Sequence, residues 1–304
     1  MNRFASNRWP LDGMAEPTKR NHPMKQNAVT RCLAVLAAAS FFCGGASAQQ
    51  AQRIVSLGGT VTEIIYDLKM QHTLVADDQS SLYPEAATKL PRVGYYRAVP
   101  AEGVLSLKPD LVIASENAGP PASLEKVRSV GVKVVTVSDK PTVDSLYERI
   151  EQIAQALDVP EKGKALAAEI QANVKQAQAR PSDSLRTVLI LNRTGAKLMA
   201  GGDTTASAIM EMAGLENVLK PQRGYKPVSA ESLLALKPEM IIVTSGSLQA
   251  AGGIDKFKSD PAIAFTPAVK NNRIVVMDDL LALGMGPRVG LAISQLKAAA
   301  GYAN

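Results

Sequence analysis

Cysteine and tryptophan are nearly absent from this chain of 304 residues. It contains two cysteines, Cys32 and Cys43, and one tryptophan, Trp9, all of which precede residue 49. The remaining chain of about 256 residues therefore has no disulfide framework and no cysteine to act as nucleophile or metal ligand. Its stability must come from packed hydrophobic cores, and its length allows two domains of ordinary size.

Histidine and the signatures of common enzymes are scarce as well. His72 is the single histidine beyond residue 48, and it reads as a surface residue after the first predicted helix. The sequence contains no His-Glu-x-x-His metal motif, no Gly-x-Ser-x-Gly turn and no Walker phosphate-binding loop. The pairs Asp77-Asp78 and Asp278-Asp279 are typical of turn caps rather than of a metal site. We therefore predict that the protein is not an enzyme.

Long hydrophobic runs are also missing, and the one notable apolar stretch lies in a leader. Basic residues up to Arg31 precede the apolar stretch 32–43, which is shorter than the ~20 residues that span a membrane. Ala46-Ser47-Ala48 then fits a cleavage site. We predict that residues 1–48 are a leader with a signal peptide, that Met24 is the natural start, and that cleavage follows about Ala48. The alternatives are an ordered N-terminal extension or a lipoprotein.

The positive net charge belongs mainly to this leader. Six of the 34 Lys and Arg residues and two of the 28 Asp and Glu residues lie in residues 1–48, so the net charge falls from +6 to +2 beyond them. A nearly neutral chain offers no general attraction to phosphate backbones. We therefore predict no binding to nucleic acid.

A short stretch of sequence occurs twice. Residues Ala101–Ile113 return as Ala230–Ile242, and each copy reads as an amphipathic helix, a Lys-Pro stop and a β-branched strand. A Gly-Tyr pair precedes each copy, Gly94-Tyr95 in the first and Gly224-Tyr225 in the second. Two similar units indicate two lobes with a cleft between them, across which the two loops face each other.

The chain between and around the repeats predicts the same organisation. Short apolar strands alternate with helices in residues 49–158, which favours a parallel sheet with crossovers. A long stretch rich in Ala, Gln, Glu and Lys follows, and the prolines at its ends bound a helix at 159–181. We predict an N-terminal lobe, 49–158, a connector helix, 159–181, and a C-terminal lobe, 182–304. The alternative for the helix is an ordinary surface helix of one domain.

This arrangement resembles the periplasmic substrate-binding proteins of ABC importers whose two lobes are joined by one long helix. Those proteins serve cobalamin, siderophores and haem. The run Val93–Ala98, which contains Gly-Tyr-Tyr-Arg, is similar to the haem-binding branch, as are Ala200–Gly202, Gly224–Ser229 and Gly286–Arg288. The resemblance covers essentially the whole chain beyond residue 48. It implies an α/β fold of two Rossmann-like lobes, a ligand cleft between them and a periplasmic location.

The resemblance implies that Tyr95 binds the iron of ferric haem, because a Gly-Tyr-x-Arg loop supplies the tyrosine ligand in that branch. Tyrosinate is a known axial ligand of haem iron, and ferric iron favours the deprotonated phenol. The cation of Arg97 would stabilise the same phenolate. Tyr96 either lines the pocket or packs the loop, and it is the second candidate for the ligand.

In the second lobe, Tyr225 occupies the position that corresponds to Tyr95. It either approaches the other porphyrin face or a propionate, or it packs against its own lobe. Lys226, Arg223 and Arg288 are candidate cations for the two propionates, whose charges need partners where they are buried.

The resemblance also implies protein partners. Glu102 and Glu231 hold the same place in the two copies of the repeat, and such residues dock on the two halves of an inner-membrane ABC permease with its ATPase. Alternatively, both glutamates only favour the positive end of their helix dipoles. We expect a monomeric protein that captures haem and delivers it to that permease. The alternative cargo is cobalamin or a ferric siderophore.

Overall fold

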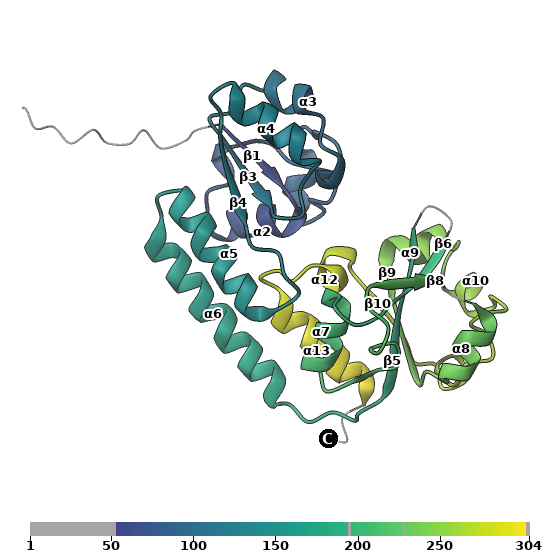
Figure 1. The fold of residues 1–304 in the computed structure, drawn as a ribbon. Helices are drawn as coiled ribbons and strands as arrows, with labels where there is room; N and C mark the ends of the chain where they lie inside the picture. Colours follow the sequence, from purple (N-terminus) through teal and green to yellow (C-terminus); the bar gives the residue numbers. More distant parts are fainter. Residues whose placement is uncertain (1–52, 194–195, 228, 302–304) are drawn as a thin grey trace, which may run out of the picture. The chain divides into compact units, whose positions relative to one another are not determined.

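The N-terminal lobe is built on a parallel sheet. The computed structural model describes residues 53–193, 196–227 and 229–301, so the predicted leader lies outside the described residues. Within these ranges the first sheet has the strand order β2-β1-β3-β4. Figure 1 labels β1, β3 and β4 of this sheet. Its strands are β1 (Ile54–Leu57), β2 (Leu74–Ala76), β3 (Leu111–Ser115) and β4 (Lys133–Val137). Every residue of β1 and β3 is buried, as expected for central strands covered on both faces.

Helices cover both faces of this sheet. They are α2 (Gly59–Asp67), α3 (Ala101–Ser106), α4 (Pro121–Ser129) and α5 (Val143–Ala156), with short 3-10 turns at Gln71–Thr73, Glu85–Lys89 and Tyr96–Ala98. Successive strand residues point to opposite faces. Val55 and Val112 therefore pack in one core with residues of α3 and α4, whereas Ile54 and Ile113 pack in another with residues of α2 and α5.

The connector is a single helix, α6 (Pro160–Ala179), where the sequence predicts one. Its 20 residues span about 30 Å at the usual rise per residue. A Cβ at Gly163 would lie 2.5 Å from that of Ala154, so only glycine allows α5 and α6 to pack this closely. Lys162 donates to the carbonyl oxygen of Leu68 at the end of α2, at 3.2 Å. At the other end, the buried Lys297 donates to the carbonyl oxygen of Arg180, at 2.6 Å.

The C-terminal lobe follows the predicted scheme only in part. Its sheet, among the described residues, has the order β10-β9-β5-β6-β8, with β7 beside β5. The strands are β5 (Arg186–Arg193), β6 (Ala196–Ala200), β7 (Glu216–Asn217), β8 (Tyr225–Pro227), β9 (Met240–Thr244) and β10 (Ile274–Met277). Strands β5, β9 and β10 pair in parallel, and β9 is the strand of the second repeat copy. The sequence analysis missed β6 and β8, which pair antiparallel. Only two residues separate β5 from β6, and a parallel crossover needs about a dozen.

Most helices of this lobe are short, and the last one is the longest of those described. They are α7 (Thr205–Met212), α8 (Ala230–Leu236), α9 (Ser245–Ala250), α10 (Ile254–Lys258), α11 (Pro267–Lys270), α12 (Asp279–Leu283) and α13 (Val289–Ala300). The last helix, α13, begins two residues after Pro287. No described helix has both the length and the apolar character that crossing a bilayer requires.

The sequence repeat is also a structural repeat. In the first copy, Arg53 donates from its side chain to the carbonyl oxygen of Leu107, at 2.6 Å, at the end of α3. In the second, Arg186 donates to the carbonyl oxygen of Leu236, at 2.8 Å, at the end of α8. The Lys of each Lys-Pro pair has a positive φ, 49° and 46° respectively. Each copy therefore ends its helix and enters its strand in the same way.

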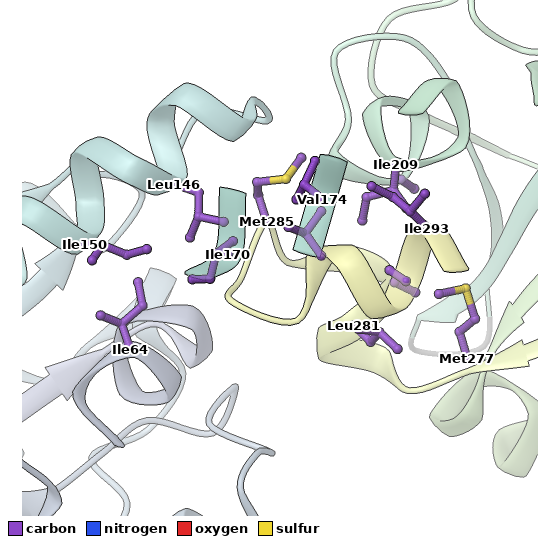
Figure 2. Close-up of a cluster of buried hydrophobic side chains, with 14 of the residues drawn as sticks. Ile64, Leu146, Ile150, Ile170, Val174, Ile209, Met277, Leu281, Met285 and Ile293 are labelled. Atoms are coloured by element: carbon purple, nitrogen blue, oxygen red, sulfur yellow. The ribbon is translucent and has the colours of Figure 1, made fainter. Parts of the chain in front are cut away.

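The largest hydrophobic core runs through both lobes and the connector. Ile64 and Ile150 of the N-terminal lobe belong to the same buried cluster as Ile170 of α6 and Ile209 and Ile293 of the C-terminal lobe. Figure 2 shows these side chains, with those of α6 alongside residues from α2, α5, α12 and α13. A shared core beneath the lobes limits how far they can separate, because separation would expose apolar surface at about 25 cal/mol per Å².

Candidate functional site

A cleft of about 500 Å³ lies between residues of the two lobes. Its N-terminal wall is formed by the loops that follow strands β1 to β4. Ligands of open α/β sheets bind outside the carboxyl ends of parallel strands, so this is the expected place for a site. The lining residues of this wall are Gly58, Gly59, Thr60, Ser80, Leu82, Tyr95, Tyr96, Arg97, Asn117 and Asp139.

Tyr95, Tyr96 and Arg97 lie together on this wall, as the sequence analysis predicted for a pocket loop. Gly94 has a φ of 102°, which favours glycine, and it turns the chain into Tyr95. The two tyrosine rings are 5.0 Å apart at 76°, an edge-to-face contact. Arg97 donates from Nε to the hydroxyl of Tyr96, at 2.9 Å. The loop therefore presents two phenols and one guanidinium to the cleft.

The two phenols are not equivalent. Burial raises the pKa of Tyr96 to about 12, although the nearby charge of Arg97 acts to lower it. Tyr96 is thus held as a neutral phenol that accepts a hydrogen bond from Arg97. The pKa of Arg97 is raised because Tyr96 and Tyr95 together outweigh the lowering effect of its burial. Arg97 therefore remains a cation beside both phenols.

Asp139 forms the deeper polar part of the wall. It accepts hydrogen bonds from Ser115 Oγ, at 2.6 Å, and from the side-chain amide of Asn117, at 3.2 Å. Behind it, the fully buried Arg149 places Nη2 3.0 Å from Asp139 Oδ1. Arg149 also donates to Thr60 Oγ1, at 2.7 Å, on the same wall. A buried cation thus neutralises the carboxylate that faces the cleft.

The C-terminal wall is mainly apolar. Its lining residues are Leu191, Leu198, Thr205, Tyr225, Asp279, Leu280, Leu283 and Gly284. Leu191 and Leu198 come from the β5–β6 hairpin, and Leu280 and Leu283 come from α12. Tyr225 lies on β8 opposite Ala200 of β6, and 40% of it is exposed. The cleft therefore places a polar wall opposite leucine side chains.

The structure does not bring the other predicted cations into the cleft. Arg288 donates to Glu63 Oε1, at 2.7 Å, and lies over the ring of Tyr83, 3.6 Å from its centre. Burial raises the pKa of Glu63, although Arg288 acts to lower it. Arg223 is an ion-pair partner of Asp203. Among the described lining residues, Arg97 is therefore the single cation. Lys226 is not a lining residue and follows Tyr225 on β8.

The two glutamates of the repeat have different surroundings. Both lie in the first turn of their helices, α3 and α8, and both are exposed. Glu102 forms an ion pair with Lys126 of α4, at 2.5 Å, and this hydrogen bond lowers the pKa of Glu102. Glu231 has no such ion pair within the described part of the chain.

The aspartate pairs act mostly as the sequence analysis expected. Asp278 caps α12 by accepting from the amide of Leu281, at 2.9 Å, and Asp78 accepts from the amide of Ser80, at 2.9 Å. Asp77, by contrast, is buried, and within the described part of the chain neither of its carboxylate oxygens accepts a hydrogen bond. Over the described ranges, no three His, Cys, Asp or Glu side chains gather as a metal site.

Sequence reasoning missed several residues of the cleft. Asn117 and Asp139 follow β3 and β4, so the rule about carboxyl ends of parallel strands could have found them. Nothing in the sequence pattern singles out Leu198 or Leu283, because an apolar residue in a wall has the same signature as one in a core.

Comparison with known families classifies this two-lobed chain. Residues 54–281 match the model of the periplasmic binding protein family. The chain belongs to this family. That membership agrees with the predicted periplasmic location and with the prediction that the protein is not an enzyme. The predicted α/β fold is confirmed by the family match and by the solved structures described next.

Solved structures similar to this periplasmic binding protein include three periplasmic heme-binding proteins. RhuT from Roseiflexus sp. RS-1 in apo form is 38% identical with a TM-score of 0.78, and the match covers 82% of this chain and 97% of RhuT. BhuT in complex with two hemes is 37% identical with a TM-score of 0.76, covering 81% and 97%. HutB of Vibrio cholerae is 34% identical with a TM-score of 0.73, covering 81% and 98%.

The names of the curated relatives give a different ligand, vitamin B12. The vitamin B12-binding protein of Vibrio campbellii (strain ATCC BAA-1116) is 29% identical over 226 residues, which are 74% of this chain and 80% of the relative. That of Yersinia pestis (strain Pestoides F) is 30% identical over 205 residues, 66% and 72% respectively. Both names fall within the range of cargoes that the sequence resemblance implied.

Proposed function

We propose that this periplasmic binding protein captures ferric haem in the cleft through a tyrosinate–iron bond from Tyr95 and delivers it to an inner-membrane ABC permease. The observation that carries the proposal is the Tyr95-Tyr96-Arg97 loop, which lies on the polar wall opposite the leucines of the other lobe. Similarity to three heme-binding proteins at 34–38% identity supports the same cargo.

Tyr95 is the iron ligand in this proposal, and its two neighbours have supporting roles. Phenolate oxygen is an established ligand of haem iron. Arg97 stabilises the phenolate as a nearby cation. Tyr96, whose pKa burial raises to about 12, stays a neutral phenol and holds Arg97 through the 2.9 Å hydrogen bond.

The opposite wall suits the porphyrin ring. Leu191, Leu198, Leu280 and Leu283 offer an apolar surface, and ligand sites typically combine such surfaces with a few polar groups that fix orientation. Tyr225 contacts the ligand from the edge of this wall. Lys226 and Arg97 are the cations proposed for the propionates, because Arg288 is engaged by Glu63.

Delivery rests on the family and on the two repeats. We propose that the leader, residues 1–48, directs export and that the mature chain works as a monomer in the periplasm. Glu102 and Glu231 would dock on the two halves of the permease and its ATPase, since complementary charges orient such encounters. The proposed boundaries remain an N-terminal lobe, 49–158, a connector, 159–181, and a C-terminal lobe, 182–304.

Absorbance titration with ferric haem tests the proposal. The protein is titrated alongside Tyr95→Phe, which removes one oxygen, and Tyr96→Phe, the matched control on the same loop. We expect saturable Soret changes and tyrosinate charge-transfer bands in the wild type and in Tyr96→Phe. In Tyr95→Phe the charge-transfer bands should vanish and the affinity for haem should fall by about a hundredfold or more. Loss of a residue that only supports a metal ligand already lowers affinity by up to about a hundredfold.

Each other outcome has a definite meaning. Bands that persist in Tyr95→Phe and vanish in Tyr96→Phe would move the iron ligand to Tyr96. Absence of saturable haem binding would overturn the haem proposal.

Cobalamin is the second candidate, favoured by the names of the curated relatives. A parallel titration with cyanocobalamin tests it. Saturable binding of cyanocobalamin that Tyr95→Phe leaves unchanged, together with no binding of haem, would establish cobalamin as the cargo.

A further inference from the structure

Three segments of the N-terminal lobe meet at the carboxylate of Asp78. Its Oδ1 accepts from the amide of Gly58, at 2.8 Å, in the turn that leads from β1 to α2. Its Oδ2 accepts from the amides of Ser80, at 2.9 Å, and Tyr96, at 3.1 Å. Asp78 is fully buried. One carboxylate therefore connects the β1–α2 turn, its own loop and the tyrosine loop.

We propose that Asp78 is the positioning residue of the iron-binding loop, because its carboxylate fixes the backbone from which Tyr95 enters the cleft. This inference rests on the proposed function of Tyr95. Hydrogen bonds from amides to a carboxylate are about twice as strong as neutral ones. In a buried place they are also little weakened by solvent.

Backbone hydrogen bonds hold other parts of the loop, including one from the amide of Ala98 to the carbonyl oxygen of Tyr95, at 2.8 Å. The carbonyl oxygen of Tyr96 accepts from the amide of Gly119, at 2.9 Å, and that of Gly94 accepts from the amide of Gln79, at 2.8 Å. Tyr96 is thus held at its amide by Asp78 and at its carbonyl by Gly119. Tyr95 lies between two held positions, Gly94 and Tyr96. Without Asp78, one of the two clamps on Tyr96 is lost.

The adjacent Asp77 offers a matched comparison. It is the same residue type and equally buried, yet neither carboxylate oxygen has a hydrogen-bond partner. Its nearest cation is Arg92, whose Nε lies 3.6 Å from Asp77 Oδ1. Asp77→Asn therefore replaces a buried carboxyl group without removing a side-chain hydrogen bond to the tyrosine loop.

The test compares Asp78→Asn with Asp77→Asn in two measurements. Amide hydrogen exchange in the ligand-free protein reports on the Tyr96 amide. We expect the Tyr96 amide to exchange about tenfold faster in Asp78→Asn and unchanged in Asp77→Asn. Asparagine keeps one acceptor oxygen and replaces the other by an NH₂ group, which cannot accept a hydrogen bond, so the amides that Asp78 now binds lose one of their two acceptors. Haem dissociation, followed by transfer to an acceptor protein, should be about tenfold faster in Asp78→Asn. Its charge-transfer bands should shift, whereas those of Asp77→Asn should not.

Whether Asp78→Asn weakens or strengthens haem binding distinguishes a positioning role of Asp78 from a purely electrostatic one. A carboxylate disfavours a nearby phenolate, so a purely electrostatic role predicts tighter haem binding in Asp78→Asn. Tighter binding, or equal effects in both variants, would overturn the proposal. If Asp78→Asn does not fold, Asp78→Glu keeps the charge and moves the oxygens, and the same shifts are expected from it. If the wild type binds no haem, the proposed function fails, and exchange of the Tyr96 amide alone decides whether Asp78 fixes the loop.

Discussion

Tyr95 and Tyr225 occupy equivalent positions just before the two copies of the repeat, yet the two lobes hold them differently. Tyr95 lies in a short loop in which the amide of the next residue, Tyr96, donates to the carboxylate of the buried Asp78. Tyr225 lies on β8, where backbone pairing with β6 holds it. A hydrogen bond to one side chain fixes the backbone at a single residue. Pairing between strands fixes every residue along the edge of the sheet.

The difference extends to the whole of each lobe. Among the described residues, the buried carboxylates are Glu63, Asp77 and Asp78, and all three belong to the N-terminal lobe. The C-terminal lobe instead inserts the β5–β6 hairpin, which brings Leu198 to the cleft. The two copies of the repeat therefore form the same scaffold, in which Arg53 and Arg186 have the same structural role. Residues outside the repeat make the cleft wall polar in the N-terminal lobe and apolar in the C-terminal lobe.

Arg149→Met should break the polar wall most severely. The substitution leaves Asp139, whose side chain is 19% exposed at the cleft, without its buried cation. It also removes the hydrogen bond from Arg149 to the carbonyl oxygen of Met285 in the C-terminal lobe, at 3.0 Å. We expect the free energy of unfolding to fall by about 3–5 kcal/mol, as for other buried pairs that lose one partner. Urea unfolding measures it. The control is Arg128→Met on the surface of α4, and equal losses in both variants would contradict the prediction.

The buried carboxylates should make stability of the N-terminal lobe depend on pH. Burial raises the pKa of Asp77 to about 7, against the lowering effect of Arg92, whereas an unfolded Asp titrates near about 3.9. The folded state therefore retains a proton that the unfolded state has lost, and stability decreases as pH rises from about 4 to 7. Asp77→Asn stays neutral throughout.

Urea unfolding at pH 5 and pH 8 tests this. The free energy of unfolding of Asp77→Asn minus that of the wild type should be larger at pH 8 than at pH 5. A difference that is constant between the two pH values would refute the assignment to Asp77.

Leu198→Ala tests the apolar wall without touching the polar one. Removing part of one leucine from a ligand wall costs about tenfold in affinity, within the range for small apolar changes in a pocket. The charge-transfer bands of bound haem should stay unchanged, because the iron ligand lies on the other lobe. Leu234→Ala, on the exposed surface of α8, should leave the affinity unchanged. Altered bands in Leu198→Ala would show that the walls do not act separately.

The smallest effect is expected at the two glutamates. Lys126 competes for Glu102 in the free protein, and Glu231 has no such partner among the described residues. Lys126→Ala should raise the stimulation of the permease ATPase by at most about threefold, since surface charges mainly affect encounter rates. Reconstituted permease provides the measurement, with Lys133→Ala as the control. A decrease in stimulation would mean that Lys126 itself docks.

Local signals in the sequence were enough to predict the repeat and the connector. Pro160 opens α6, and the Lys-Pro pairs end α3 and α8, because proline acts on the backbone regardless of distant contacts. The tyrosine loop was found from its motif. These features depend on neighbours in the chain.

Features that depend on distant partners could not be predicted. Arg288 reads as a propionate-binding residue until Glu63, 225 positions earlier, is placed beside it. The strands β6 and β8 are short, and their pairing becomes visible only when the sheet is assembled. Asp77 and Asp78 are neighbouring residues of the same type. The local sequence therefore cannot show which carboxylate binds the tyrosine loop and which one lacks hydrogen bonds among the described residues.

The position of α13 in the shared core has a consequence for synthesis. A chain is made from its N-terminus, so the strands of the first lobe emerge long before Ile293 and Lys297. Until they arrive, the core beneath both lobes is open on one side and the carbonyl oxygens at the end of α6 lack their lysine. The two lobes are therefore not finished one after the other. Completion of the shared core therefore waits for α13.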